Sequence, residues 1–149
     1  KVLVEENIKG REIECSVLGN ERPIVSVPGE IIPQEEFYSY TAKYSAESKT
    51  AYAIPAKLPN HLIKKIQELA IKTFTTLECE GMARVDFFLT PANKILVNEI
   101  NTIPGFTKIS MYPKLWEQSG IPYPKLIDML ITLAIRRFKK EGTLKTSYE

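Results

Sequence analysis

The sequence predicts an α+β fold in which helices pack on a mainly antiparallel sheet. Short runs typical of strands come first, a long amphipathic segment follows, and a second pair of strand-like runs precedes two more helical segments. Strands and helices that are grouped in this way, rather than alternating, are typical of such sheets. The 149 residues allow one domain or two small lobes and are enough to bury a core.

An antiparallel meander is expected at the start of the chain. Residues 2–4 are apolar and β-branched, and residues 24–27 return as a strand after a turn at residues 19–23. Between them, residues 12–18 alternate: Ile13, Cys15 and Val17 oppose Glu12, Glu14 and Ser16. Alternation of this kind predicts a sheet with one buried face and one solvated face.

Residues 28–59 show no sustained period. The stretch is broken by Pro28, Gly29, Pro33, Pro55 and Pro59. At about 30 residues it exceeds the usual ceiling of roughly 12–15 for a structureless loop, which predicts a functional or mobile loop. It contains Phe37, Lys43 and Tyr44. These side chains are either the tips of a surface loop or parts of a lid whose lysine contacts an anion.

Three helices are expected in the remaining chain. Asn60 is a favourable N-cap, and apolar residues recur at helical spacing from there toward Gly81. Residues 110–118 predict a second helix after the Pro104–Gly105 loop. A third, long helix follows Pro122 and Pro124 and stops at Gly142; its apolar positions are Leu126, Ile127, Leu130, Ile131, Ala134 and Phe138.

Residues 84–101 predict a hairpin with its turn at residues 91–94. A four-residue loop would set Thr90 opposite Ile95, and therefore Asp86 opposite Glu99 and Arg84 opposite Asn101, all on one face. Opposed β-carbons lie about 5 Å apart, so the two carboxylates repel unless a cation lies between them. Such oxygens suit Mg²⁺, which usually shares its shell with substrate phosphates. The alternative is a solvated hairpin with scattered charges, and a slip of one residue would separate the two acids.

Composition excludes several classes of function. The net charge of +2 is too small to indicate nucleic acid, and no apolar run of 18 residues indicates a membrane span. Cys15 and Cys79 are in no metal-binding spacing, which favours free thiols in a reducing cytoplasm. His61 is expected at the surface. The chain has no signal peptide or initiator Met, and opens directly in a strand-like run, so we expect it to be part of a longer polypeptide.

Several motifs together resemble a known family. Glu5 and Glu12 flank a Gly10 turn, a lysine lies in a long loop, and Arg84-x-Asp86 pairs with Asn98-Glu-x-Asn101. The most specific string is NEINTIPGFTKISMYP, which starts at Asn98. The chain, over roughly residues 2–138, is similar to the ATP-grasp superfamily and within it to the D-alanine–D-alanine ligases. The resemblance implies an ATP-grasp carboxy-terminal lobe with a lid loop at about residues 28–59.

The resemblance also implies roles for individual residues. Asp86, Glu99 and Asn101 would hold two Mg²⁺ or Mn²⁺ ions between the β- and γ-phosphates of ATP. Arg84 would stabilise charge on the transferred phosphoryl group, which its permanently charged guanidinium suits. The remaining nucleotide contacts would come from Glu5, Asn7 and Ile8 at adenine, Glu12 at ribose, Phe88 under the base, Asn98, and Lys43 and Phe37 from the lid. Gly105, Ser110 and Met111 would receive the carboxylate of the second D-alanine. The catalytic residues that the resemblance implies are Arg84, Tyr44 and Gly105.

The implied reaction has two steps. The carboxylate of one D-alanine attacks the γ-phosphate to give an acylphosphate, and the amine of a second D-alanine then attacks that carbonyl, forming D-alanyl-D-alanine for peptidoglycan precursors. Tyr44, which follows the lid lysine, favours D-alanine over D-lactate as second substrate. Ser39 stands where many such ligases carry an acid. The alternatives are a D-alanine–D-lactate or other ATP-grasp carboxylate–amine ligase, a non-catalytic nucleotide-binding module and a plain structural domain.

The amino-terminal half of the family pattern is missing from these 149 residues. It would supply the site for the first D-alanine and further phosphate contacts. The resemblance therefore implies that this chain is a carboxy-terminal portion, which by itself would bind nucleotide weakly and would not complete turnover. A homodimer is the assembly that the family suggests.

Overall fold

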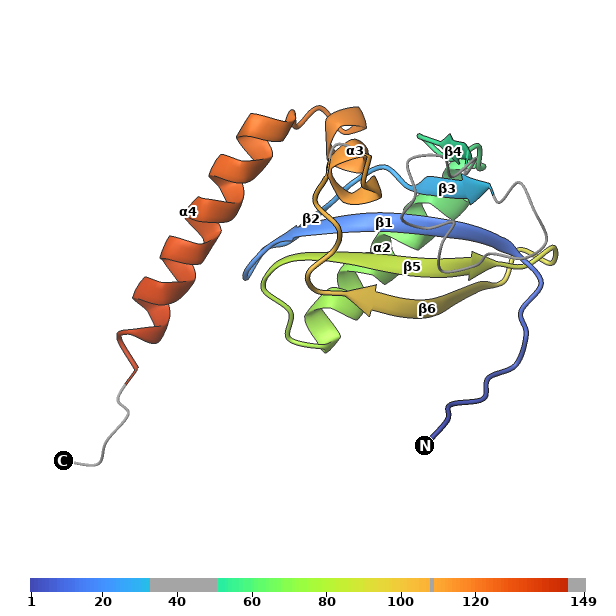
Figure 1. Ribbon diagram of the computed structural model, residues 1–149, viewed down its shortest axis with the longest axis horizontal. Coiled ribbons are helices and arrows are strands. Elements are labelled where there is room, and N and C mark those ends of the chain that lie inside the picture. The colour runs from blue at the N-terminus through green and yellow to red at the C-terminus, as the bar shows by residue number, and fades with distance from the viewer. Residues whose placement is uncertain (33–50, 108, 145–149) are drawn as a thin grey trace.

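The computed structural model describes residues 1–32, 51–107 and 109–144 and shows a sheet of six strands (Figure 1). The strands β4-β3-β1-β5-β6 lie in that order, β2 pairs with β1, and every pairing is antiparallel. The strands are β1 (Arg11–Gly19), β2 (Ile24–Val25), β3 (Gly29–Ile32), β4 (Ala51–Ala53), β5 (Gly81–Leu89) and β6 (Ile95–Asn101). The described helices are α2 (Asn60–Thr76), α3 (Met111–Gln118) and α4 (Tyr123–Glu141). The α+β prediction is confirmed.

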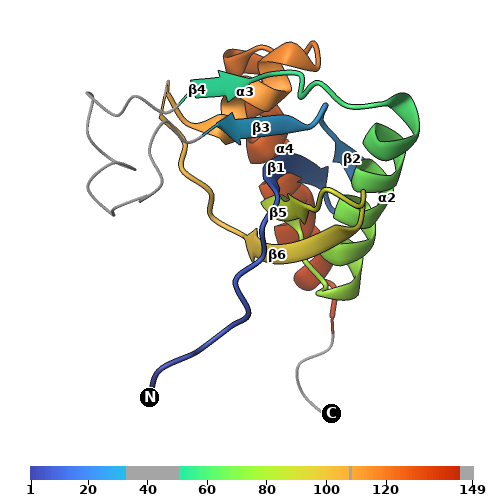
Figure 2. The same cartoon turned by 90° about the vertical axis from the view of Figure 1, so that its right-hand side faces the viewer.

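Helix α2 covers one face of the sheet, as Figure 2 shows edge-on. Its apolar stripe packs on alternate residues of β1 and β5. On β5, the residues that point toward α2 are fully buried, whereas those between them are only partly buried. The core formed here comprises Ile13, Cys15, Val17, Leu62, Ile66, Ala70, Phe74, Ala83, Val85, Phe87 and Leu89, with Ala56. Alternation along β5 thus leaves Arg84, Asp86 and Phe88 on the face away from α2.

Strand β1 is buried on both faces from Ile13 onward, so the prediction of one solvated face is wrong for this strand. The reason is a second core on the face away from α2, formed by Leu18, Tyr112, Trp116 and Leu126. The Tyr112 hydroxyl donates a hydrogen bond of 3.0 Å to the carbonyl of Val17. Helix α3 therefore covers one end of that face and leaves the other end open.

Several expected elements differ in the structure. Residues 2–4 form no strand; Val2, Leu3 and Val4 are 81–89% exposed, and no described strand lies beside them. The strand expected at residues 24–27 is limited to β2. The expected loop of residues 28–59 begins and ends in the paired strands β3 and β4, and residues 33–50 lie outside the described part. Asn60 is the first residue of α2 rather than its N-cap, because Pro59 holds that position.

Helix α4 begins and ends close to its predicted bounds, but few of its apolar residues are covered. Leu126 is buried, whereas Ile127, Ile131 and Phe138 are exposed. Figure 1 shows α4 beside one end of the sheet. Cys15 and Cys79 are free thiols, as predicted. No helix in the described part of the chain has the length and apolar character needed to cross a membrane.

Gly29 allows α3 to pack directly on the backbone of β3. A β-carbon at this buried position would lie 2.7 Å from both Leu115 Cδ2 and Met111 Cε. We expect Gly29→Ala to lower the free energy of unfolding by about 1–3 kcal/mol through overpacking, measured by urea denaturation. Gly142→Ala is the matched control, because Gly142 already has right-handed helical backbone angles. Equal unfolding midpoints for both variants would contradict the close contact.

Candidate active site

Three cross-strand rows of side chains lie on the face of the sheet away from α2. Each row takes one residue from β1, one from β5 and one from β6. The rows are Glu12–Phe88–Leu96, Glu14–Asp86–Glu99 and Ser16–Arg84–Asn101. The predicted pairs Asp86–Glu99 and Arg84–Asn101 are therefore confirmed.

The register nearer the turn is different from the prediction. The backbone N–H of Thr90 donates to the carbonyl of Lys94 at 3.0 Å, with Asn93 in the left-handed region at φ 58°. The loop is thus one residue shorter than expected, and Ile95 pairs with Leu89 rather than with Thr90. A β-bulge beside Asp86 takes up one residue of β6, because Glu99 pairs with Asp86 while Val97 pairs with Phe87. The shorter turn and the bulge offset one another, which restores the predicted register at the acids.

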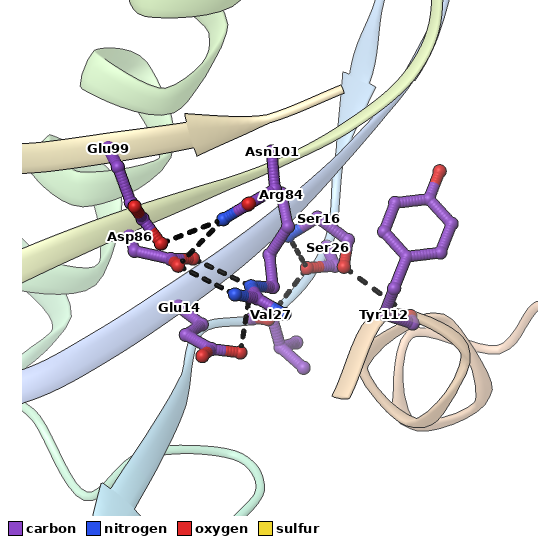
Figure 3. Close-up of polar contacts among 9 residues, drawn as sticks. All are labelled: Glu14, Ser16, Ser26, Val27, Arg84, Asp86, Glu99, Asn101 and Tyr112. Atoms are coloured by element: carbon purple, nitrogen blue, oxygen red, sulfur yellow. Dashed lines mark hydrogen bonds and ion pairs between the residues drawn. The ribbon is translucent and has the colours of Figure 1, made fainter. Parts of the chain in front are cut away.

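A polar network joins the Glu14–Asp86–Glu99 row to the Ser16–Arg84–Asn101 row (Figure 3). The Nε and Nη2 atoms of Arg84 donate to the two carboxylate oxygens of Asp86, both at 2.7 Å. The side-chain amide nitrogen of Asn101 donates to Asp86 Oδ2 and to Glu99 Oε1, both at 3.1 Å. The amide NH2 group of Asn101, which has two positively polarised hydrogens, therefore lies between the two carboxylates, at the position where a shared cation is expected.

Glu14 also borders the cavity, which the sequence pattern alone did not reveal. This residue is 5% exposed, and its Oε2 lies 3.1 Å from Arg84 Nε. It faces Asp86 across the pairing of β1 with β5. The signal was present in the alternation of Glu12, Glu14 and Ser16, but only the pairing of β1 with β5 shows what that polar face adjoins.

The charged side chains of this cluster shift the pKa values of one another. Burial lowers the pKa of the Arg84 guanidinium, but its hydrogen bond to Asp86 and the charges of Glu14, Asp86 and Glu99 outweigh burial and raise that pKa overall. Burial raises the pKa of the Asp86 carboxyl, Arg84 lowers it and the charge of Glu99 raises it, for a net increase. Burial is the largest of these effects, so the raised pKa of Asp86 reflects chiefly the removal of its carboxyl from water.

The rows border a cavity of about 460 Å³. Its opposite side is formed by the loop after β6 and the start of α3, including Gly105, Thr107, Ser110 and Met111. Ser110 is the N-cap of α3, and its hydroxyl accepts a hydrogen bond of 3.0 Å from the backbone N–H of Thr107. The cavity thus has an acidic floor on the sheet and a helix start on its rim, where backbone N–H groups favour anions.

Packing between aromatic side chains fixes the loop that carries Gly105. The rings of Phe106 and Tyr123 lie 5.3 Å apart, and the Tyr123 hydroxyl donates to the Phe106 carbonyl at 3.3 Å. A β-carbon on Gly105 would lie 3.1 Å from Ser110 Oγ, so a larger residue would crowd this rim.

The structure brings most of the described candidate residues together. Nine of them line the cavity: Glu12, Arg84, Asp86, Phe88, Asn98, Glu99, Gly105, Ser110 and Met111. Asn101 joins them through its hydrogen bonds. Glu5, Asn7 and Ile8 lie in the segment before β1 and are not among the lining residues. Phe37, Ser39, Lys43 and Tyr44 lie outside the described residues.

The donor set fits a hard divalent cation that shares its shell with a ligand. Within the described residues, no group of three or more His, Cys, Asp and Glu side chains is arranged to hold a metal ion by itself. Mg²⁺ in phosphate sites, however, is usually bound through one or two carboxylates together with substrate oxygens and waters. Asp86 and Glu99 supply two carboxylates, already bridged by the Asn101 amide, whose oxygen could be a third ligand after rotation of that group.

Comparison with known proteins decides the family of this chain. Residues 1–132 match the family model described as D-ala D-ala ligase C-terminus. The chain belongs to the D-alanine–D-alanine ligase family. It is 60% identical over 147 residues to a D-alanine–D-alanine ligase from Oceanobacillus iheyensis and 55% identical over 149 residues to one from Coxiella burnetii. These alignments cover 99% and 100% of this chain, but the chain spans only about 40% of the length of either relative.

Solved structures of this ligase family have the same fold. The D-alanine–D-alanine ligase from Coxiella burnetii matches with a TM-score of 0.81 and 52% identity, over 93% of this chain and 35% of that chain. A Bacillus anthracis D-alanine–D-alanine ligase in complex with ATP matches with a TM-score of 0.74 and 30% identity, over 93% and 42%. The VanG D-Ala:D-Ser ligase from Enterococcus faecalis matches with a TM-score of 0.73 and 39% identity, over 86% and 37%. The predicted ATP-grasp architecture is confirmed.

Proposed function

We propose that this chain is the nucleotide- and metal-binding part of an ATP-dependent D-alanine–D-alanine ligase that acts in peptidoglycan precursor synthesis. The observation that carries the proposal is the cavity lined by Asp86 and Glu99 and by Gly105, Ser110 and Met111, because acidic side chains and a helix start border the same space. The family relationship supports the ligase class, and the Bacillus anthracis relative has been solved with ATP.

Under this proposal, Asp86, Glu99 and Asn101 hold two Mg²⁺ or Mn²⁺ ions. When bound, the ions neutralise charge on the β- and γ-phosphates. Arg84 faces the same cavity and stabilises charge on the transferred phosphoryl group and on the tetrahedral intermediate. Its two short contacts with Asp86 hold the guanidinium near the cavity floor.

The other residues that line the cavity position ATP and the second D-alanine. Glu12 holds ribose, Phe88 packs under adenine and Asn98 contacts the nucleotide; these three line one end of the cavity. Glu5, Asn7, Ile8, Phe37 and Lys43 complete the nucleotide site as the resemblance implies. Gly105, Ser110 and Met111 receive the carboxylate of the second D-alanine at the start of α3. The lid that the resemblance implies would exclude water from the acylphosphate, which otherwise hydrolyses.

We further propose that catalysis needs a segment equivalent to the part of the relatives' sequences that this chain does not cover. We also propose that the complete protein works as a homodimer in the cytoplasm. The test is D-alanine-dependent phosphate release from ATP, measured for this chain alone and for the chain co-expressed with that segment. We expect release only from the combination. Full activity of the 149 residues alone would contradict the need for the segment, and no release from either would contradict the ligase assignment.

The identity of the second substrate is tested by competition. D-alanine, D-lactate and D-serine are offered together across a range of pH, and the products are separated by mass. We expect D-alanyl-D-alanine to predominate, as Tyr44 after the lid lysine implies. Predominance of the ester or of the D-serine product would assign the chain to a different second substrate.

A further inference from the structure

Glu14 is a buried acid for which the proposed mechanism has no role. Its side chain is 6% exposed on the central strand β1, and glutamate is rarely buried to this degree unless it is paired. It lies beside Asp86 in the middle row, with its Oε2 3.1 Å from Arg84 Nε. Figure 3 shows Arg84 flanked by Asp86 and Glu14, which come from two neighbouring strands.

The two acids hold Arg84 in different ways. Asp86 accepts two hydrogen bonds of 2.7 Å, one from Nε and one from Nη2. Glu14 lies farther from Arg84, with its Oε2 3.1 Å from Nε. Asp86 therefore dominates the placement of the guanidinium in the structure as it stands.

Cation binding at Asp86 would change that balance. Both oxygens of Asp86 are used by Arg84, and Oδ2 also accepts from Asn101. A divalent cation at this carboxylate competes directly with the guanidinium for the same oxygens. Once Asp86 turns to the cation, the described ion pair that Arg84 keeps is the one with Glu14.

We propose that Glu14 is a positioning residue that retains Arg84 at the cavity floor when Asp86 binds a divalent cation. The inference rests on the proposed function. Glu14 acts in two connected ways: it weakens the hold of Arg84 on Asp86, which favours cation binding, and it keeps the guanidinium facing the phosphoryl group. Glu14 is not itself assigned as a metal ligand, because the described acids include no three-member group arranged around a cation.

The test uses the intact polypeptide that contains this chain, with two independent measurements. Mn²⁺ binding is measured by electron paramagnetic resonance of the free ion, and ligase turnover is measured by phosphate release. We expect Glu14→Gln to raise the dissociation constant for Mn²⁺ and to lower kcat, each by about tenfold to a hundredfold, the usual range for residues that support metal ligands. KM for ATP is expected to stay near the wild-type value, because Glu14 contacts Arg84 rather than the base or ribose positions.

Glu30→Gln is the matched control. Glu30 is also a shielded acid in a paired arrangement, accepting from Arg11 Nε and Nη2 at 2.7 Å each. It pairs with Ile13, so it lies on the opposite face of the sheet from Glu14. Circular dichroism shows whether either variant unfolds. We expect wild-type Mn²⁺ affinity and kcat from Glu30→Gln.

A double-mutant cycle separates a role through Arg84 from a plain charge effect. In an Arg84→Met background no guanidinium competes for Asp86, so adding Glu14→Gln is expected to leave the Mn²⁺ affinity unchanged. A further loss of affinity in that background would overturn the positioning role in favour of simple attraction between Glu14 and the cation. If Glu14→Gln does not fold, Glu14→Asp keeps the charge but withdraws the carboxylate, and a smaller change in the same direction is expected.

The outcomes distinguish the inference from the proposed function. Wild-type kcat and Mn²⁺ affinity in a folded Glu14→Gln or Glu14→Asp variant would overturn the inference alone. Absence of D-alanine-dependent phosphate release from the wild-type polypeptide would overturn the ligase assignment, while the Mn²⁺ measurements still decide the role of Glu14.

Discussion

Glu99→Gln is expected to lower Mg²⁺-dependent phosphate release by the intact polypeptide on the order of 10²–10³-fold. Glutamine keeps the size of the side chain, and its carbonyl oxygen can still accept from the Asn101 amide at the present 3.1 Å contact. The substitution removes the negative charge beside Asp86. Residues 86 and 99 together then carry one negative charge, which cannot balance the two positive charges of a divalent cation. The measurement is the rate of release as a function of Mg²⁺ concentration, at saturating ATP and D-alanine.

Glu68→Gln provides the control for this prediction. Glu68 is an exposed acid on α2, on the other side of the sheet, so its loss changes net charge by the same amount without touching the cavity. We expect wild-type rates from it. Undiminished release by Glu99→Gln would contradict the metal role and would favour a non-catalytic nucleotide-binding module.

The largest loss of stability is expected from Phe74→Ala. Phe74 is fully buried in the core between α2 and the sheet, where its ring packs among residues of β1 and β5. Truncation removes the ring and leaves a cavity that the surrounding strands cannot fill. The expected decrease in the free energy of unfolding is about 3–5 kcal/mol, measured by urea denaturation followed by circular dichroism.

Leu77→Ala tests whether burial is the cause. Leu77 is the C-cap residue of α2, three residues after Phe74, and is 57% exposed, so its truncation removes an apolar group without opening a cavity. We expect a change of about 0.5 kcal/mol or less. Similar losses from Phe74→Ala and Leu77→Ala would show that the core under β5 is not packed as described.

The sequence was informative where the deciding interactions are local. The period of two along β5 determines that Arg84, Asp86 and Phe88 share a face, and the nearby turn limits which residues of β6 can oppose them. The pair Asp86–Glu99 was therefore predictable, although the observed turn is one residue shorter than the pattern predicts. Helices α2, α3 and α4 were likewise predictable in place, because apolar spacing is a property of each segment, although α2 ends at Thr76 rather than near Gly81.

Only the tertiary structure assigned Glu14 to the site and showed that β1 is buried on both faces. Both facts depend on β1 lying beside β5, about 70 residues further along the chain, and on α3 closing over the far end of the sheet. Local periodicity specifies which side chains of a strand share a face, because alternation is a property of the strand itself. Local periodicity does not specify which strand or helix lies against that face, because strand order depends on long-range packing across the whole fold.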